Sequence, residues 1–68
     1  GTEFHRRIAV GAKDRLNPGG WLLMEMGAEQ RPALGEILEE TKIFDNIRFR
    51  ADYAGLDRVV IARRKNLL

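Results

Sequence analysis

"LNPGGWLLMEMG" occupies residues 16–27, and this stretch decides the fold because a nearly continuous apolar run lies between two glycine-containing segments. Pro18 and the glycine after it fit a type II turn, which takes Pro at its second position and Gly at its third. The run from Trp21 to Met26 does not alternate polar with apolar residues, which favours a parallel strand buried on both faces. We therefore expect residues 21–26 to form a buried strand of an α/β sheet.

The chain is short for such a strand. Its 68 residues set a limit of one domain, and a domain of this size buries only about 60% of its unfolded surface. The chain has no cysteine and one histidine, His5, which excludes a disulfide framework and a zinc site built on cysteine. We therefore expect the strand to need a covering that so short a chain hardly supplies.

The charge is nearly balanced, with a formal net charge of +2. That excess is too small to indicate nucleic-acid binding, and its basic groups, His5–Arg7 and Arg63–Lys65, are interpreted as solvated. No apolar run approaches the length of about 20 residues that a membrane helix needs. No signal peptide is visible either, so we expect a cytoplasmic protein without a membrane segment.

Periodic patterns on both sides of the strand predict two helices. The first covers residues 4–16, where apolar residues repeat every four positions, and Asn17 suits a left-handed cap at its end. Its expected buried stripe is Phe4, Ile8, Ala12 and Leu16. The second covers Gln30–Thr41, with Pro32 in its first turn. Its expected buried stripe is Leu34, Ile37, Leu38 and Thr41.

The remaining residues predict two strands joined by a hairpin. Apolar residues alternate with arginines in Asn46–Asp52, which predicts a strand with one polar face. A turn at Ala54–Asp57 connects it to a second apolar strand, Arg58–Arg63. A right-handed crossover makes residues 21–26 parallel to Asn46–Asp52, and the apolar last strand is expected between them, antiparallel to both. The predicted fold class is α/β in the order α-β-α-β-β.

Few residues are candidates for chemistry. Gly19, Gly20 and Gly27 do not form a strand-Gly-x-Gly-x-x-Gly-helix pattern, so we interpret them as turn and strand-exit glycines. Glu25, at the carboxyl end of the first strand, could be a general base, cap the next helix or pair with an arginine.

The other polar and aromatic candidates favour structural roles. His5 is expected on an exposed helix face and Trp21 in the core. Asp57 and Arg58 are expected to pair with each other or with Asp52 across the hairpin. No triad, metal cluster or carboxylate pair emerges from the sequence. We therefore predict no catalytic, cofactor-binding or metal-binding residue in this chain.

Two segments carry a family resemblance. "LNPGGWLLMEMGAEQ" (residues 16–30) resembles the fifth-strand region of class I S-adenosylmethionine-dependent methyltransferases. Within it, "EMGAEQ" resembles the strand exit of the HemK/PrmC family, the N5-glutamine methyltransferases that act on peptide chain release factors. "ADYAGLDRVVIARR" (residues 51–64) resembles the closing hairpin of that family. Met26 and Leu56 depart from the family pattern, and the resemblance spans roughly residues 4–64.

The resemblance implies that residues 1–68 are one partial domain, the C-terminal part of a doubly wound class I methyltransferase sheet. Gly1 and Thr2 are interpreted as a cloning remnant. The Gly-rich cofactor loop, the acidic residue that holds the ribose and the Asn-Pro-Pro-Tyr motif of the family lie upstream, so no site residue is carried over. The parent protein is expected to use S-adenosylmethionine and to methylate a release factor. This chain alone is expected to be an inactive scaffold that binds no cofactor.

Two alternatives stay open. The parent protein could be another class I methyltransferase that acts on RNA or a small molecule. The chain could instead be a self-standing small basic module that binds a protein or nucleic acid. The uncovered central strand also predicts that the isolated chain associates with itself.

Overall fold

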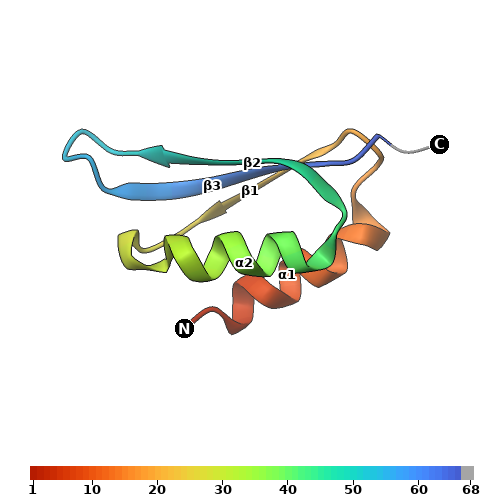
Figure 1. Ribbon diagram of the computed structural model, residues 1–68, viewed down its shortest axis with the longest axis horizontal. Coiled ribbons are helices and arrows are strands. Elements are labelled where there is room, and N and C mark those ends of the chain that lie inside the picture. Colours follow the sequence, from red (N-terminus) through yellow and green to blue (C-terminus); the bar gives the residue numbers. More distant parts are fainter. Residues whose placement is uncertain (67–68) are drawn as a thin grey trace.

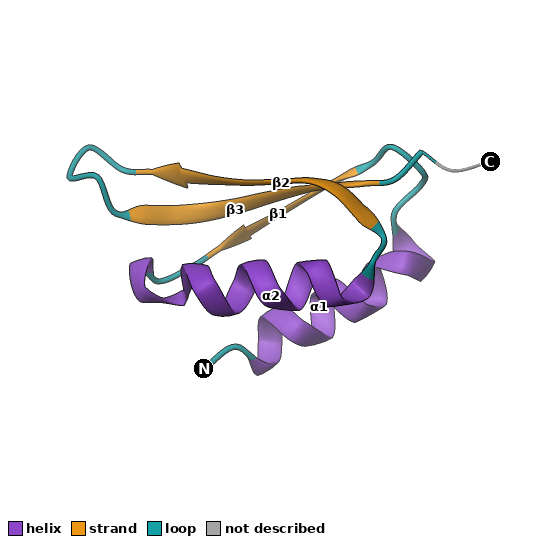
Figure 2. Cartoon of the chain, viewed as in Figure 1, coloured by secondary structure: helices purple, strands orange, loops and turns teal. Residues whose placement is uncertain are grey.

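The computed structural model describes residues 1–66 and shows two helices on one face of a three-stranded sheet. Figures 1 and 2 place both helices on the same side of the strands. The elements in chain order are α1 (Glu3–Arg15), β1 (Trp21–Glu25), the short 3-10 helix η1 (Ala28–Gln30), α2 (Arg31–Thr41), β2 (Phe44–Ala51) and β3 (Asp57–Arg64). The chain is therefore an α/β unit, as the hydrophobic patterns predict.

The sheet has the strand order β1-β3-β2, and β3 is antiparallel to both neighbours. β1 and β2 are consequently parallel to each other. The expected place of the last strand, between the other two, is confirmed. The predicted end of the first strand at Met26 is one residue too late, and the predicted start of the second at Asn46 is two residues too late. β2 begins early because Phe44 pairs with Arg64 across a local irregularity and packs in the core.

The turn that enters β1 is of type II, as predicted. Gly19 has a φ of +80°, and the N–H of Gly20 donates to the carbonyl of Asn17 at 2.8 Å. The predicted left-handed conformation of Asn17 is wrong, because in residues 1–66 only Lys42 and two glycines have positive φ. The residue before a proline is driven toward extended backbone, so Pro18 explains the difference. The left-handed residue is Gly19, where no Cβ opposes it.

The second helix follows its prediction closely. Leu34, Ile37 and Leu38 are buried, while Gln30, predicted as the first residue of this helix, belongs to η1. The helix ends at Lys42, whose backbone is left-handed with a φ of +61°. That conformation closes the helix and directs the chain into β2.

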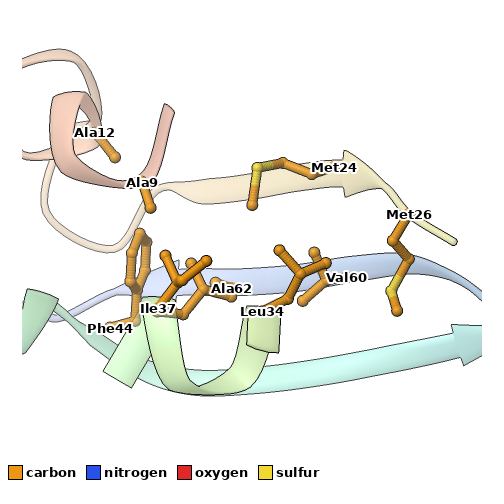
Figure 3. Packing of buried hydrophobic residues seen from close by; sticks show 10 residues of the cluster. Ala9, Ala12, Met24, Met26, Leu34, Ile37, Phe44, Val60 and Ala62 are labelled. Carbon is orange, nitrogen blue, oxygen red and sulfur yellow. The ribbon is translucent and has the colours of Figure 1, made fainter. Parts of the chain in front are cut away.

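The core lies between the two helices and one face of the sheet (Figure 3). α1 contributes only two small buried side chains, Ala9 and Ala12, which let this helix approach closely. The other members are Met24, Met26, Leu34, Ile37, Leu38, Phe44, Val60 and Ala62. The predicted first member of the α1 stripe, Phe4, is 67% exposed, so that prediction is wrong. The buried stripe of α1 runs through Ala9 instead, which places Phe4 on the flank of the helix.

Candidate interaction surface

One face of the sheet has no helix over it within residues 1–66 (Figure 1). Leu22 and Met24 face the helices, so the alternate residues of β1 point to the opposite face. On that face Leu23 is 62% exposed and Trp21 is 47% exposed. The predictions of a strand buried on both faces and of a core tryptophan are therefore wrong for this chain, because both helices pack on the same side. The cross-strand rows of the uncovered face are Trp21–Arg63–Asn46, Leu23–Ile61–Arg48 and Glu25–Val59–Arg50.

The outer edge of β1 is open as well. The N–H of Met26 donates to the carbonyl of Arg58 at 2.9 Å, which fixes the antiparallel hydrogen-bond pattern with β3. In that pattern the backbone groups of Trp21, Leu23 and Glu25 point away from β3. β1 carries no proline, lysine or bulge that would discourage another strand from pairing there. β1 thus lacks the features that protect an edge strand, and it resembles a strand from the interior of a sheet.

β2, at the other end of the sheet, has the features of a true outer strand. Its register with β3 is irregular between Phe44 and Asn46 and again between Arg50 and Ala51. Two exposed arginines, Arg48 and Arg50, stand on its uncovered face. Irregular register and charged side chains are devices that keep an edge strand from pairing with another chain. The edge at β2 is therefore protected against pairing, whereas the edge at β1 is open.

The flank of α1 that faces away from α2 continues the exposed surface. A hollow of about 350 Å³ lies along it, lined by Arg7, Ile8, Gly11 and Arg15. Phe4 is exposed on the same flank. We call the uncovered face, the outer edge of β1 and this flank together the open side. Its apolar members are Phe4, Ile8, Trp21, Leu23, Val59 and Ile61. The open side is the candidate interaction surface.

His5 joins α1 to the carboxyl end of β1. Its Nε2 lies 2.8 Å from the carbonyl oxygen of Glu25, so Nε2–H donates. Its Nδ1 is buried and has no hydrogen-bond partner in residues 1–66. The prediction of an exposed surface histidine is wrong, because α1 passes beneath the sheet and the end of β1 partly covers the imidazole.

In the described part of the chain, Glu25 neither caps the next helix nor pairs with an arginine, the two structural roles considered for it. Its carboxylate is exposed and makes no hydrogen bond or ion pair within residues 1–66. The N–H of Gly27, just after β1, is bound instead by Oε1 of Gln30 at 2.8 Å. Gln30 thus takes the capping role considered for Glu25. The alternative of a general base stays a hypothesis.

The basic end of the chain has a structural role that its composition does not reveal. The Arg64 guanidinium donates to the carbonyl of Leu16, and the Arg64 N–H donates to that of Gly20 at 2.8 Å. Arg63 Nε lies 3.4 Å from the carbonyl of Gly19. Both side chains are half-buried, so their interpretation as solvated residues is wrong. They hold the turn before β1 against the end of β3.

The β2–β3 hairpin is fixed by one carboxylate. Asp52 accepts from the N–H groups of Ala54 and Leu56, at 2.9 and 3.0 Å, and from Arg58 Nε at 2.9 Å. The Arg58 hydrogen bond, followed by that of Leu56, lowers the pKa of Asp52 below its ordinary range. The predicted pair of Arg58 with Asp52 is confirmed. Asp57 pairs instead with Arg31 of α2 at 3.3 Å.

Two further kinds of feature concern the described part of the chain, a cluster of metal ligands and a membrane-spanning helix. Residues 1–66 contain no group of three or more His, Asp and Glu side chains that could hold a metal ion. Within the same range, no helix is long and apolar enough to cross a membrane.

Comparison with known proteins gives one consistent result. The chain is 40% identical over 98% of its length to the release factor glutamine methyltransferase of Clostridium acetobutylicum. It is 43% identical over 93% of its length to that of Neisseria gonorrhoeae, and 41% over 94% to that of Aquifex aeolicus. The chain spans less than a quarter of each relative, 23%, 23% and 22% respectively. No family model and no solved structure matches it.

Proposed function

We propose that this chain, which is homologous over nearly its whole length to one segment of the release factor glutamine methyltransferases, is a structural part of such an enzyme. The resemblance to this family, noted from the sequence motifs, is confirmed by these relatives. The whole enzyme transfers a methyl group from S-adenosylmethionine to a glutamine side chain of a peptide chain release factor. Within it, this segment is a scaffold at the C-terminal end of the doubly wound sheet.

The observation that supports a segment rather than a complete module is the asymmetry of the sheet. β2 has an irregular, arginine-bearing edge, whereas β1 has an open edge beside the exposed Trp21 and Leu23. An edge with unpaired backbone groups and apolar neighbours invites another strand. In the whole enzyme the open side would be covered by the remainder of the protein. The self-standing module explains this asymmetry less well.

The glycines at the two ends of β1 serve turns of the chain. A Cβ at Gly20 would lie 2.9 Å from the carbonyl oxygen of Asn17, so the turn before β1 has no room for a side chain there. The N–H of Gly27 is bound by Oε1 of Gln30 at 2.8 Å. Neither glycine lies in the strand-Gly-x-Gly-x-x-Gly-helix pattern of a nucleotide-binding loop. We propose that the cofactor binds outside residues 1–68 and that the isolated chain is inactive. Micromolar binding of S-adenosylmethionine to this chain in a calorimetric titration would contradict that proposal.

The function is tested with the complete protein encoded by the reading frame that contains this chain. It is incubated with methyl-labelled S-adenosylmethionine and a purified bacterial peptide chain release factor, and the product is mapped by mass spectrometry. We expect one methyl group on a glutamine side chain and none on a factor in which that glutamine is replaced by alanine. Labelling of RNA or of a small molecule, with an unmodified factor, would instead support another class I methyltransferase.

A further inference from the structure

The turn between β2 and β3 projects from the rest of the molecule (Figure 1). We call its residues, Asp52–Leu56, the hairpin tip. The tip follows the carboxyl end of β2, which is parallel to β1. α/β sheets place their ligand sites at the carboxyl ends of their parallel strands. The tip therefore lies at the end of the sheet where α/β enzymes bind their substrates.

The tip exposes two large side chains with no role in the core. Tyr53 is fully exposed, and Leu56 is 44% exposed. Neither is packed against the hydrophobic core, and Tyr53 makes no hydrogen bond within residues 1–66. Scattered exposed apolar residues are common. Two large exposed side chains on one five-residue loop, at the carboxyl end of the strands, instead indicate a contact surface.

The backbone of the tip is hydrogen-bonded at several points. Besides the three hydrogen bonds to its carboxylate, Asp52 donates its N–H to the carbonyl of Leu56 at 2.9 Å, and its carbonyl accepts from Gly55 at 3.0 Å. Gly55 has a φ of +83°, which closes the turn. A loop held in one conformation loses little entropy when it binds a partner. The backbone on either side of Tyr53 is thus held by hydrogen bonds, while its side chain stays free to contact a partner.

The charges beside the tip indicate the kind of partner. The strands next to it carry Arg48, Arg50 and Arg58, all exposed, against Asp52 and Asp57. The excess is positive, and it adjoins an exposed tyrosine. Tyrosine and arginine are the residues that most often carry the binding energy of a protein–protein interface. A complementary surface has carboxylates around a hollow that accepts the tyrosine ring.

We infer that the hairpin tip binds the protein substrate at a place apart from the reacting glutamine, with Tyr53 as the anchor and Arg50 facing substrate carboxylates. This inference rests on the proposed function and assigns to the segment a role in substrate recognition beside its role as scaffold. Nucleic acid is the less favoured partner, because Arg58 and Arg31 already pair with Asp52 and Asp57.

The test compares two substrates of the complete protein, an intact bacterial release factor and a synthetic peptide of about ten residues around the methylated glutamine. Tyr53→Ala should raise KM for the intact factor about tenfold or more, as truncation of an interface anchor does, and leave kcat unchanged. KM for the peptide should stay the same, because the peptide lacks the remote surface. Asp52→Ala, which frees the loop but keeps Tyr53, should raise KM for the intact factor by a smaller factor.

Val10→Ala is the control variant. Val10 is 63% exposed, but it lies on the α2 flank of α1 and away from the hairpin. This variant should behave as the wild type with both substrates. An unchanged KM of Tyr53→Ala for the intact factor overturns the inference, as does an equal rise for the factor and the peptide. Loss of binding of an RNA oligonucleotide in Tyr53→Ala would also overturn it, in favour of nucleic acid. If the wild-type protein methylates no release factor, the proposed function itself fails.

Discussion

The Nε2–H of His5 donates a 2.8 Å hydrogen bond to the carbonyl oxygen of Glu25. That carbonyl points away from β3, so His5 occupies the last acceptor on the outer edge of β1. The part of this edge left for another strand runs from Trp21 to Leu23. One contact thus ties α1 beneath the sheet and limits where a further strand can pair.

The isolated chain should associate through this open edge. An antiparallel pair of β1 strands related by a two-fold axis would place Trp21 of one copy opposite Leu23 of the other, and the two-fold dimer is the commonest closed assembly. Leu23→Lys should suppress association, because a lysine on an edge strand discourages pairing with another strand. Val10→Lys, at a position of similar exposure (63% against 62%), should not. Light scattering coupled to size exclusion over a concentration series measures the mass. A folded wild-type chain that stays monomeric throughout would contradict the account and favour the self-standing module.

The stability of the isolated chain should depend on the helix-facing side of the sheet and hardly on its uncovered face. Leu38→Ala removes a fully buried side chain and should lower the free energy of unfolding by about 2–5 kcal/mol. Leu23→Ala makes the same chemical change at an exposed position, so it should lower the free energy of unfolding by much less than Leu38→Ala does. Urea unfolding followed by circular dichroism, at a concentration where the chain is monomeric, compares the two. Equal losses would show that the uncovered face is packed in solution.

Two glycines should respond to alanine in opposite directions. Gly11 lies inside α1, and a Cβ there meets no atom within 4 Å, so Gly11→Ala should stabilise by about 1 kcal/mol. Gly55 has equally open surroundings but a φ of +83°, so Gly55→Ala should destabilise by about 1–2 kcal/mol. Thermal unfolding of both variants is the measurement. A stabilising Gly55→Ala would mean that the hairpin tip is not held in this conformation.

Acid should weaken the hairpin through Asp52. Its pKa is lowered in the folded chain, chiefly by the hydrogen bond from Arg58. A lowered folded pKa means that the carboxylate stabilises the fold fully above the unfolded pKa of about 3.9 and loses this effect as the pH falls further. The difference in thermal midpoint between the wild type and Asp52→Asn should therefore be constant near neutral pH and shrink below about pH 4. A difference that grows on acidification would contradict this sign.

Much of the fold could be predicted from sequence because its local signals agree. Pro18 and Gly19 specify the type II turn, and the 3.6-residue period of α2 marks Leu34 and Leu38 as buried. The order of the strands follows from the apolar character of β3. The hairpin pair of Asp52 with Arg58 follows from their places on either side of a short turn.

The errors arise where the sequence pattern depends on residues outside the chain or on distant contacts. The run Trp21–Met26 indicates a strand covered on both faces, but residues 1–66 cover only one. The basic composition around His5 and Arg64 indicates solvated side chains, yet each donates to a carbonyl on a segment at least 20 residues away. Such contacts leave no periodic signal. Of the candidate surface, the sequence predicts only the open strand β1, and no pattern marks the fully exposed Tyr53.

The central claim is that β1 is an interior strand of a larger methyltransferase sheet, whereas β2 is its true edge. Hydrogen exchange of single amides in the complete protein tests this most directly. The N–H of Leu23 points away from β3 on one edge of the sheet, as those of Ile47 and Phe49 do on the other. We predict slow exchange at Leu23, where a neighbouring strand accepts its hydrogen bond, and fast exchange at Ile47 and Phe49. Fast exchange at Leu23 in the complete, folded protein would contradict the claim.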